Sequence, residues 1–273
     1  MATMDWSAQG GSGPENYESF LVPAMFAPFA EKLVVDAGIE PGMRVLDVAC
    51  GTGAASRAAA RRAGASGSVT GVDLGEPTLA IARSHPPEPG AAAIEYLQGE
   101  AGALPVSEND FDVVICQQGL QFFPDRGVAL AAMRTALKPG GSLAVATWTG
   151  VDSNPFGAVA DALESHASGE AAQMLRSPFR LTKQELAEAV VGAGFSEVDV
   201  HEETMECTWA APPADFARRT IAAGPVAGAF NALPDDVQQA VADAAAERLV
   251  ANATPDGDGL RMPMTSFVAL ARA

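Results

Sequence analysis

A carboxylate and a glycine-rich turn are the residues of this sequence best suited to chemistry. Asp47 lies in the apolar segment 45–48, and the turn that follows carries Gly51 and Gly53. Glycine has no Cβ, so such a turn can adopt positive φ and let a ligand approach its backbone N–H groups closely. A helix over residues 54–62 would point its N-terminal dipole at the same ligand. The spacing therefore predicts a ligand site where the first strand ends.

A second carboxylate, Asp73, ends the next apolar segment and lies 20 residues after Gly53. An acidic residue at this distance holds ribose hydroxyls in nucleotide-binding α/β folds, so we expect a ligand that carries a nucleoside. A dinucleotide cofactor is the competing interpretation. It is disfavoured because Ser56 replaces the third glycine of G-x-G-x-x-G, and because Asp47, not an apolar residue, precedes the turn.

The elements that must position these residues alternate regularly between residues 43 and 148. The pattern predicts strand 43–48, helix 54–63, strand 68–73, helix 76–84, strand 93–98, strand 111–116, helix 125–136 and strand 142–148. This alternation is typical of a parallel sheet with helices on both faces, and segments 45–48 and 112–116 are as apolar as central parallel strands should be. Ligands bind at the carboxyl edge of such sheets.

Helical segments flank this regular core. At the N-terminal end, Pro23 and Pro28 are expected to break the chain into short helices. Beyond residue 148 the pattern predicts helices 154–164 and 183–193, strand 196–208, a helical stretch over 211–252 and a last strand 264–272. Residues 211–258 would then be an insertion between two strands of the sheet.

Composition bounds the class of protein. The 273 residues are 48% hydrophobic, enough to bury the core of one large α/β domain. The net charge of −17 would repel nucleic acid. The three cysteines form no CxxC, which favours reduced thiols over disulfides or a metal site. No apolar run reaches the ~20 residues that span a bilayer, and no signal peptide is recognisable. We expect a cytoplasmic bacterial protein, a monomer or homodimer, that binds neither nucleic acid nor membrane.

Four motifs in the right order resemble the class I S-adenosylmethionine-dependent methyltransferases. They are Leu46–Gly53, Asp73, Gly99–Ala101 and Leu137–Gly141. The resemblance covers about residues 40–148, and it points to the small-molecule group that includes the quinone-biosynthesis C-methyltransferases. It implies a Rossmann-like, three-layer α/β sandwich with a mostly parallel, seven-stranded sheet. It also implies S-adenosyl-L-methionine as cofactor and S-adenosyl-L-homocysteine as product.

The resemblance assigns cofactor-binding roles to the first two strand ends. Ala49, Gly51 and Gly53 would cradle the methionine end of the cofactor with their backbone. Asp47 would lie near the cofactor's amino group, unless this carboxylate simply caps the nearby helix. Asp73 would bind the ribose hydroxyls.

The adenine end and the next strand complete the implied cofactor site. Leu74 would lie against the adenine, and the Ala101 N–H could donate to the ring. Glu100 departs from the family, which most often has aspartate before that alanine; it could accept from the adenine amino group or be an ordinary surface residue. The Gln117 carbonyl would meet the methionine amino group.

The acceptor is expected between the sheet and helical lids. Gln121 and Phe122 would line the approach to the methyl group, together with Tyr17 and Trp148. The expected units are an N-terminal helical lid over 1–38, a cofactor-binding domain over 39–210 plus 259–273, and a helical cap over 211–258. The lids contribute many large apolar residues, which are Tyr17, Phe20, Met25, Phe26, Trp148, Phe156, Phe179, Trp209, Phe216 and Phe230.

Together these features predict in-line methyl transfer to a small, largely apolar metabolite, aromatic or terpenoid-like, as in secondary metabolism. Because the methyl donor would already be cationic, alignment and exclusion of water should dominate, with a base needed only for a neutral acceptor. No metal is expected. Of the three histidines, His166 is the candidate base, since it lies in a segment that borders the acceptor pocket in this family. The alternative is a protein that binds S-adenosylmethionine without methylating, as a cyclase-type catalyst or a regulator.

Overall fold

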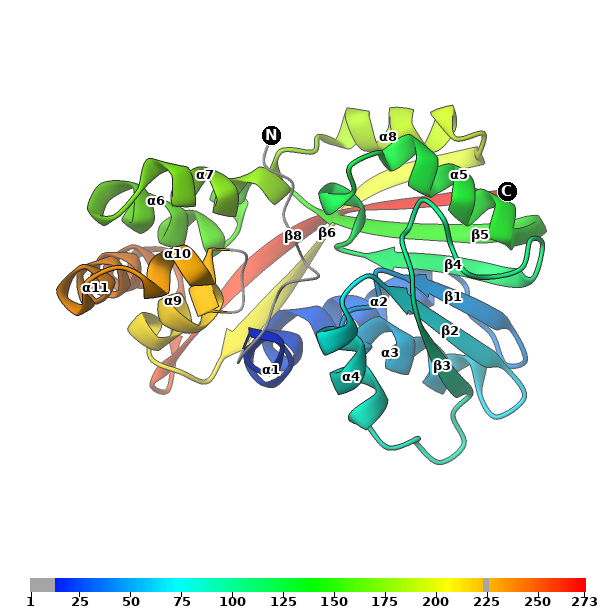
Figure 1. Ribbon diagram of the computed structural model, residues 1–273, viewed down its shortest axis with the longest axis horizontal. Helices are drawn as coiled ribbons and strands as arrows, with labels where there is room; N and C mark the ends of the chain where they lie inside the picture. Colours follow the sequence, from blue (N-terminus) through cyan, green and yellow to red (C-terminus); the bar gives the residue numbers. More distant parts are fainter. Residues whose placement is uncertain (1–12, 223–225) are drawn as a thin grey trace.

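A single mixed sheet organises the chain (Figure 1), and the computed structural model describes residues 13–222 and 226–273. Its strands run in the order β3-β2-β1-β4-β5-β8-β6, with β7 paired to β8 outside this path. The strands are β1 (Arg44–Val48), β2 (Ser68–Asp73), β3 (Ala93–Gln98), β4 (Phe111–Gln117), β5 (Leu137–Trp148), β6 (Ser196–Trp209), β7 (Thr254–Asp256) and β8 (Gly259–Arg272).

The first five strands are parallel, and β8 lies antiparallel between β5 and β6. This is the predicted Rossmann-like, mostly parallel α/β fold, which the structure confirms. One difference is β7, a short strand that pairs with β8 at the end of the stretch expected to be a helical cap, 211–258. The other is the length of β5, which begins at Leu137 because that residue pairs with Phe111.

Helices cover both faces of the sheet, as Figure 1 shows. The helices are α2 (Ala27–Asp36), α3 (Ala54–Ala63), α4 (Glu76–Ser84), α5 (Arg126–Ala136) and α8 (Lys183–Gly192). Alternate strand residues point to opposite faces, so Val45 and Val113 pack with α2 and α3, while Leu46 and Val114 pack with α5 and α8. Hydrophobic burial on both faces fixes the register of the strands whose carboxyl ends carry the predicted site.

A helical cap lies beside the sheet, over the extended ends of β6 and β8 (Figure 1). It contains α6 (Phe156–His166), α7 (Gly169–Arg176), α9 (Pro213–Ala222), α10 (Ala227–Asn231) and α11 (Asp235–Asn252), with short 3-10 turns η3 (Leu120–Phe122), η4 (Val151–Ser153) and η5 (Ser177–Phe179) nearby. Helices α9 to α11 follow β6 and precede β8, in the stretch expected to be an insertion. They share one hydrophobic cluster with α6, α7 and the N-terminal helix. Residues 1–12 of the expected lid and 223–225 of the expected cap lie outside the described residues.

The N-terminal segment is one continuous helical run rather than a set of broken helices. It consists of α1 (Gly13–Asn16), the π-helical segment η2 (Tyr17–Phe26) and α2. The predicted break at Pro23 is wrong: the residue lies inside η2, whose wider turns end with Ala27 donating to Val22. Phe20 and Met25 are buried in the cap cluster, so tertiary packing stabilises a helix that proline would otherwise disfavour. No helix within 13–222 and 226–273 is both long and apolar enough to cross a bilayer.

Candidate functional site

The turn between β1 and α3 is built from residues in the left-handed region of φ. Ala49, Gly51 and Gly53 have φ values of 60°, 53° and 86°. Gly53 is the N-cap residue of α3, and a Cβ at this position would overlap the phenolic oxygen of Tyr96. The chain therefore reverses sharply enough to bring the N-terminus of α3 beside the end of β1, and only glycine fits at Gly53.

Asp47 is a fully buried carboxylate at the end of β1. Its Oδ2 accepts a hydrogen bond of 2.6 Å from the Ser56 hydroxyl on α3, whereas its Oδ1 is buried and has no partner among the described residues. Burial raises the pKa of Asp47 from 3.8 to about 7; the hydrogen bond from Ser56 opposes this shift, and the charge of Asp73 adds to it. A buried carboxylate with one free oxygen is suited to bind a cationic group.

A small cavity of about 30 Å³ is lined in part by Asp47. Its walls come from the turn, the start of α3, the end of β4 and η2. The lining residues are Tyr17, Phe26, Asp47, Ala49, Cys50, Gly51, Thr52, Ala54, Ala55 and Gln117. The hydroxyl oxygen of Thr52 is a second buried atom that has no partner among the described residues, so the residues lining this cavity offer both acceptor and donor capacity. An amino-acid group, with an ammonium and a carboxylate, matches these two orphaned atoms and the N–H groups at the start of α3.

Asp73, at the end of β2, is tied to the same turn. Its Oδ2 accepts from the Gly51 N–H at 2.8 Å, and its Oδ1 accepts from the Gly75 N–H at 2.8 Å. Burial raises the pKa of Asp73, and these backbone hydrogen bonds lower it. Carboxylate oxygens have lone pairs for further donors, so Asp73 can still accept from hydroxyl groups of a ligand.

The ends of β2 and β3 are held side by side, which places the residues expected at the adenine end. The Gly99 N–H donates to the Asp73 carbonyl at 3.0 Å, and the Gln98 side chain donates to the Leu74 carbonyl at 3.0 Å. Leu74 is 42% exposed, unusual for leucine. Glu100 is also exposed, and Ala101 is half-buried. This edge presents an apolar side chain and a carboxylate to solvent.

Gln117 joins the cavity to the N-terminal helix. Its side-chain amide donates to the Phe26 carbonyl at 2.8 Å.

Three residues expected near the methyl acceptor, Gln121, Phe122 and Trp148, are not among the residues that line this cavity. Gln121 accepts from the Trp148 N–H at 3.0 Å, and the Trp148 ring packs at 5.8 Å from the Phe26 ring. Phe122 is half-buried in η3. Trp148 is 3% exposed and lies within the cap cluster instead of lining the cavity.

The large apolar residues expected to enclose an acceptor mostly fill the core. Only Tyr17 and Phe26 of that set line the small cavity. The other members are buried against one another in the cap cluster. They give the cap its stability, and the pattern of aromatic residues alone could not distinguish that role from a pocket.

The histidines lie apart from the small cavity. His166 is the exposed last residue of α6 and does not line the cavity. His201 is on β6, with its Nδ1 3.0 Å from the Asp199 carboxylate. His85 follows α4, with its Nε2 2.9 Å from the Glu18 carboxylate on η2.

Thr52 and Arg57 contribute to the site, although the sequence did not assign them a role. Thr52 sits between the two glycines, and its position inside the motif was the available signal. Arg57 donates to the Thr52 carbonyl at 2.7 Å. This contact leaves no pattern in the sequence, because it joins a side chain to a backbone carbonyl that it meets only in the fold.

One group of potential metal ligands lies outside this site. Side chains of Asp36, His201 and Glu203 come together where α2 meets β6. The ammonium of Lys32 lies 2.6 Å from Asp36 and 3.2 Å from Glu203, so a cationic side chain already neutralises the cluster.

A second cavity, of about 190 Å³, lies within the cap. Leu163, Met174, Phe230 and Leu233 contribute to its largely apolar wall. All of its lining residues belong to the cap helices or to the short connections next to them.

Comparisons with known proteins agree with this geometry. Residues 45–141 match a family described as a methyltransferase domain. The ubiquinone/menaquinone biosynthesis C-methyltransferase of Shewanella halifaxensis is 37% identical over 128 residues, 46% of this chain and 50% of that protein. The chain spans about half the length of the curated relatives it matches.

Two solved structures show the same fold. Phosphoethanolamine N-methyltransferase 2 of Haemonchus contortus, in complex with S-adenosyl-L-methionine, superposes with a TM-score of 0.62 at 18% identity, covering 99% of this chain and 60% of that one. The cyclase SpnF superposes with a TM-score of 0.51 at 22% identity, covering 90% of this chain and 80% of that one.

Proposed function

We propose that this chain, whose residues 45–141 match a methyltransferase domain, is a class I S-adenosylmethionine-dependent enzyme that transfers a methyl group to a small, largely apolar metabolite. The observation that carries the proposal is that Asp47 and Thr52 both line one cavity at the glycine-rich turn, and that each has a buried side-chain oxygen, Oδ1 and Oγ1, without a partner among the described residues. Burying polar atoms without partners is unfavourable, so a ligand that satisfies both is expected.

Different residues of the chain would bind different parts of this cofactor. Asp47 would bind the ammonium of its amino-acid end, and Thr52 with the turn N–H groups would bind the carboxylate. Asp73 would accept from the ribose hydroxyls while it continues to hold the Gly51 N–H. Leu74 and the segment Glu100–Ala101 would lie at the adenine. Gln117 would contact the amino-acid end.

The methyl group needs little chemical activation by the chain. S-adenosylmethionine, when bound, supplies a methyl group on a sulfonium that already carries positive charge. The chain's contribution is then alignment of the acceptor and exclusion of water. An acceptor that is already nucleophilic needs no protein base. The candidate base, His166, is exposed and does not line the cavity.

An apolar acceptor is supported by two aromatic rings on η2 beside the cofactor cavity and by the names of the relatives. Tyr17 and Phe26 present rings where the cavity meets η2, with 4.7 Å between their centroids. Several of the similar proteins are named as ubiquinone/menaquinone biosynthesis C-methyltransferases, and the acceptors that such a name implies are largely apolar. We infer an acceptor of that general kind and leave its identity to experiment.

Calorimetry with S-adenosylmethionine and S-adenosylhomocysteine tests the cofactor, and mass spectrometry of molecules that co-purify with the protein tests the acceptor. We expect micromolar binding by the wild type, and binding at least about tenfold weaker by Asp47→Asn, which loses a charge-assisted contact. Incubation with the identified acceptor should convert the cofactor to S-adenosylhomocysteine. Absence of binding by a folded wild type would refute the proposal.

A non-methylating role is the second candidate, because one protein of the same fold is named as a cyclase. The same incubation separates the two. Product formation that consumes no S-adenosylmethionine would favour the cyclase-type role, and stoichiometric appearance of S-adenosylhomocysteine would exclude it.

A further inference from the structure

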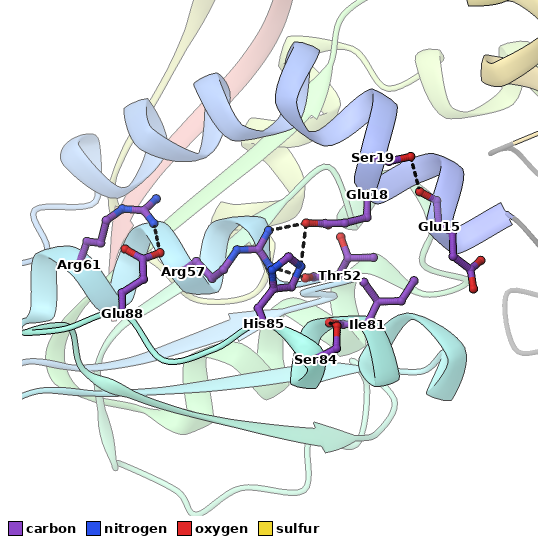
Figure 2. A network of polar contacts seen from close by, with 10 residues as sticks. All are labelled: Glu15, Glu18, Ser19, Thr52, Arg57, Arg61, Ile81, Ser84, His85 and Glu88. Carbon is purple, nitrogen blue, oxygen red and sulfur yellow. Dashed lines mark hydrogen bonds and ion pairs between the residues drawn. The ribbon is translucent and has the colours of Figure 1, made fainter.

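An ion pair connects the N-terminal helix to the helix that starts at the glycine-rich turn (Figure 2). The Glu18 carboxylate on η2 accepts from Arg57 Nη2 on α3 at 2.9 Å, and the same oxygen lies 2.9 Å from His85 Nε2. The side chains of Glu18 and Arg57 are only 17% and 16% exposed. Shielding from water makes such a pair more strongly coupled than an ordinary surface ion pair.

Arg57 also holds the turn itself. Its Nη1 donates to the Thr52 carbonyl at 2.7 Å, while its own backbone N–H donates to the Gly53 carbonyl at 2.9 Å. The guanidinium is a rigid planar fork, so holding Glu18 with one arm fixes the direction of the other. The position of η2 and the conformation of the turn are therefore mechanically linked through one side chain.

Glu18 is adjacent to Tyr17, which lines the cavity together with Asp47 and Thr52. That cavity, about 30 Å³, has room for only one or two water molecules. An amino-acid group is larger than this space, so a wall must move when it binds, and Tyr17 belongs to the wall that η2 contributes rather than to the sheet, the turn or α3. The link between Glu18 and Arg57 resists this movement directly, because it joins the residue next to Tyr17 to the turn below.

We propose that Glu18 and Arg57 form a latch that closes the start of η2 over the glycine-rich turn and sets the rate at which the cofactor enters and leaves. Arg57 is a positioning residue: it acts on the ligand through the Thr52 peptide. The identity of the ligand rests on the proposed function, whereas the latch itself rests on the contacts of Glu18 and Arg57.

A neighbouring ion pair provides a matched control. Arg61, one turn further along α3, pairs with Glu31 on α2 and with Glu88 at 2.6 Å (Figure 2). These side chains are more than 40% exposed, and no hydrogen bond or ion pair found within residues 13–222 and 226–273 joins them to η2 or the turn. Glu88→Gln therefore measures how removal of an ordinary, exposed ion pair on α3 changes ligand dissociation and hydrogen exchange.

The experiment compares Glu18→Gln and Arg57→Lys with Glu88→Gln and Arg61→Lys. The first readout is the dissociation rate of labelled S-adenosylhomocysteine, chased with unlabelled ligand. The second is hydrogen–deuterium exchange of residues 13–26 in the protein without ligand. We expect Glu18→Gln to speed dissociation at least about tenfold and to speed exchange over residues 17–26, with less than about twofold change in the controls.

Arg57→Lys keeps the positive charge but loses the fork, so it should reproduce both effects. If the urea midpoints of Glu18→Gln and Arg57→Lys are close to those of the control variants, a loss of global stability does not explain the faster dissociation and exchange. Equal dissociation and exchange rates in Glu18→Gln and Glu88→Gln would overturn the latch. If the folded wild type binds no S-adenosylhomocysteine, the proposed function fails instead, and the exchange comparison still decides whether the latch exists.

Discussion

The backbone N–H of Gly51 donates to the Asp73 carboxylate across 2.8 Å, joining the turn after β1 to the end of β2. The two strands pair in parallel along their length, so this contact continues their alignment into the ligand site. A residue that would bind ribose thus also shapes the turn that would bind the amino-acid end.

This double role predicts a double defect in Asp73→Asn. An amide nitrogen facing the Gly51 or Gly75 N–H would leave a buried donor unpaired, which should lower stability by about 1–3 kcal/mol. Cofactor affinity should fall at least tenfold. Urea denaturation measures the stability and calorimetry the cofactor affinity. Asp199→Asn is the control, because the Asp199 side chain is exposed on β6. A variant that lost affinity at unchanged stability would show that Asp73 acts on the ligand alone.

Cofactor affinity should depend on pH through Asp47. With a pKa of about 7, this carboxyl is mostly neutral at pH 6 and ionised at pH 8. A bound ammonium requires the ionised form, so affinity for S-adenosylhomocysteine should rise about tenfold from pH 6 to pH 8 and level off above. Calorimetry at four pH values measures this. Asp47→Asn should bind weakly at every pH, and a wild type with a flat profile would contradict the assignment.

Stability of the ligand-free protein should show the opposite trend. Because the pKa of Asp47 is raised on folding, the native state binds more protons than the unfolded state between pH 4 and 7. The free energy of unfolding should therefore fall as pH rises through this window, with Asp47 contributing up to about 1.4 kcal/mol per pH unit. Urea denaturation of wild type and Asp47→Asn at pH 5 and 7 isolates the contribution, since the asparagine variant lacks it.

Gly53 tolerates no side chain, for two separable reasons. Gly53→Ala combines a left-handed φ of 86°, worth about 1–2 kcal/mol, with overlap against the Tyr96 hydroxyl. Gly51 has a φ of 53°, but a Cβ there would meet no atom within 4 Å. Gly51→Ala should therefore lose only the about 1–2 kcal/mol that the left-handed backbone costs. Urea denaturation should rank Gly53→Ala as the less stable variant. Tyr96→Phe in the Gly53→Ala background should recover part of the difference.

Ala49 offers the reverse experiment. It holds a φ of 60° with a Cβ, and glycine would relieve about 1–2 kcal/mol of strain while adding about 0.5–1 kcal/mol of unfolded-state entropy. Ala49→Gly should therefore raise the free energy of unfolding by about 0.5–1 kcal/mol. Ala187→Gly, inside α8, should lower it by a similar amount. Destabilisation by both would mean that the Ala49 Cβ packs more favourably than its φ suggests.

The sequence predicted the elements around the candidate site and the helical insertion before the last strand closely, but not the path of the N-terminal segment. Helix α3, strand β2 and helix α4 have the predicted bounds, because glycines, prolines and hydrophobic period mark their ends locally. The π-helical path through Pro23 and the partners of Glu18 were not predictable, since they depend on residues far away in the chain. Asp47 was recognised by position, but its raised pKa needed the burial that only the fold provides.

The long ladder between β6 and β8 limits how the molecule can open. From Asp199 opposite Leu270 to Trp209 opposite Leu260, the two strands pair without a break, beginning in the sheet and ending in the cap. Trp209 is 1% exposed within the cap cluster, so the same ladder belongs to both cores. Hinge motions need a few residues that can absorb large changes of φ and ψ, and a paired ladder provides none. Sheet and cap should therefore move as one body, with access to the site controlled from the N-terminal side.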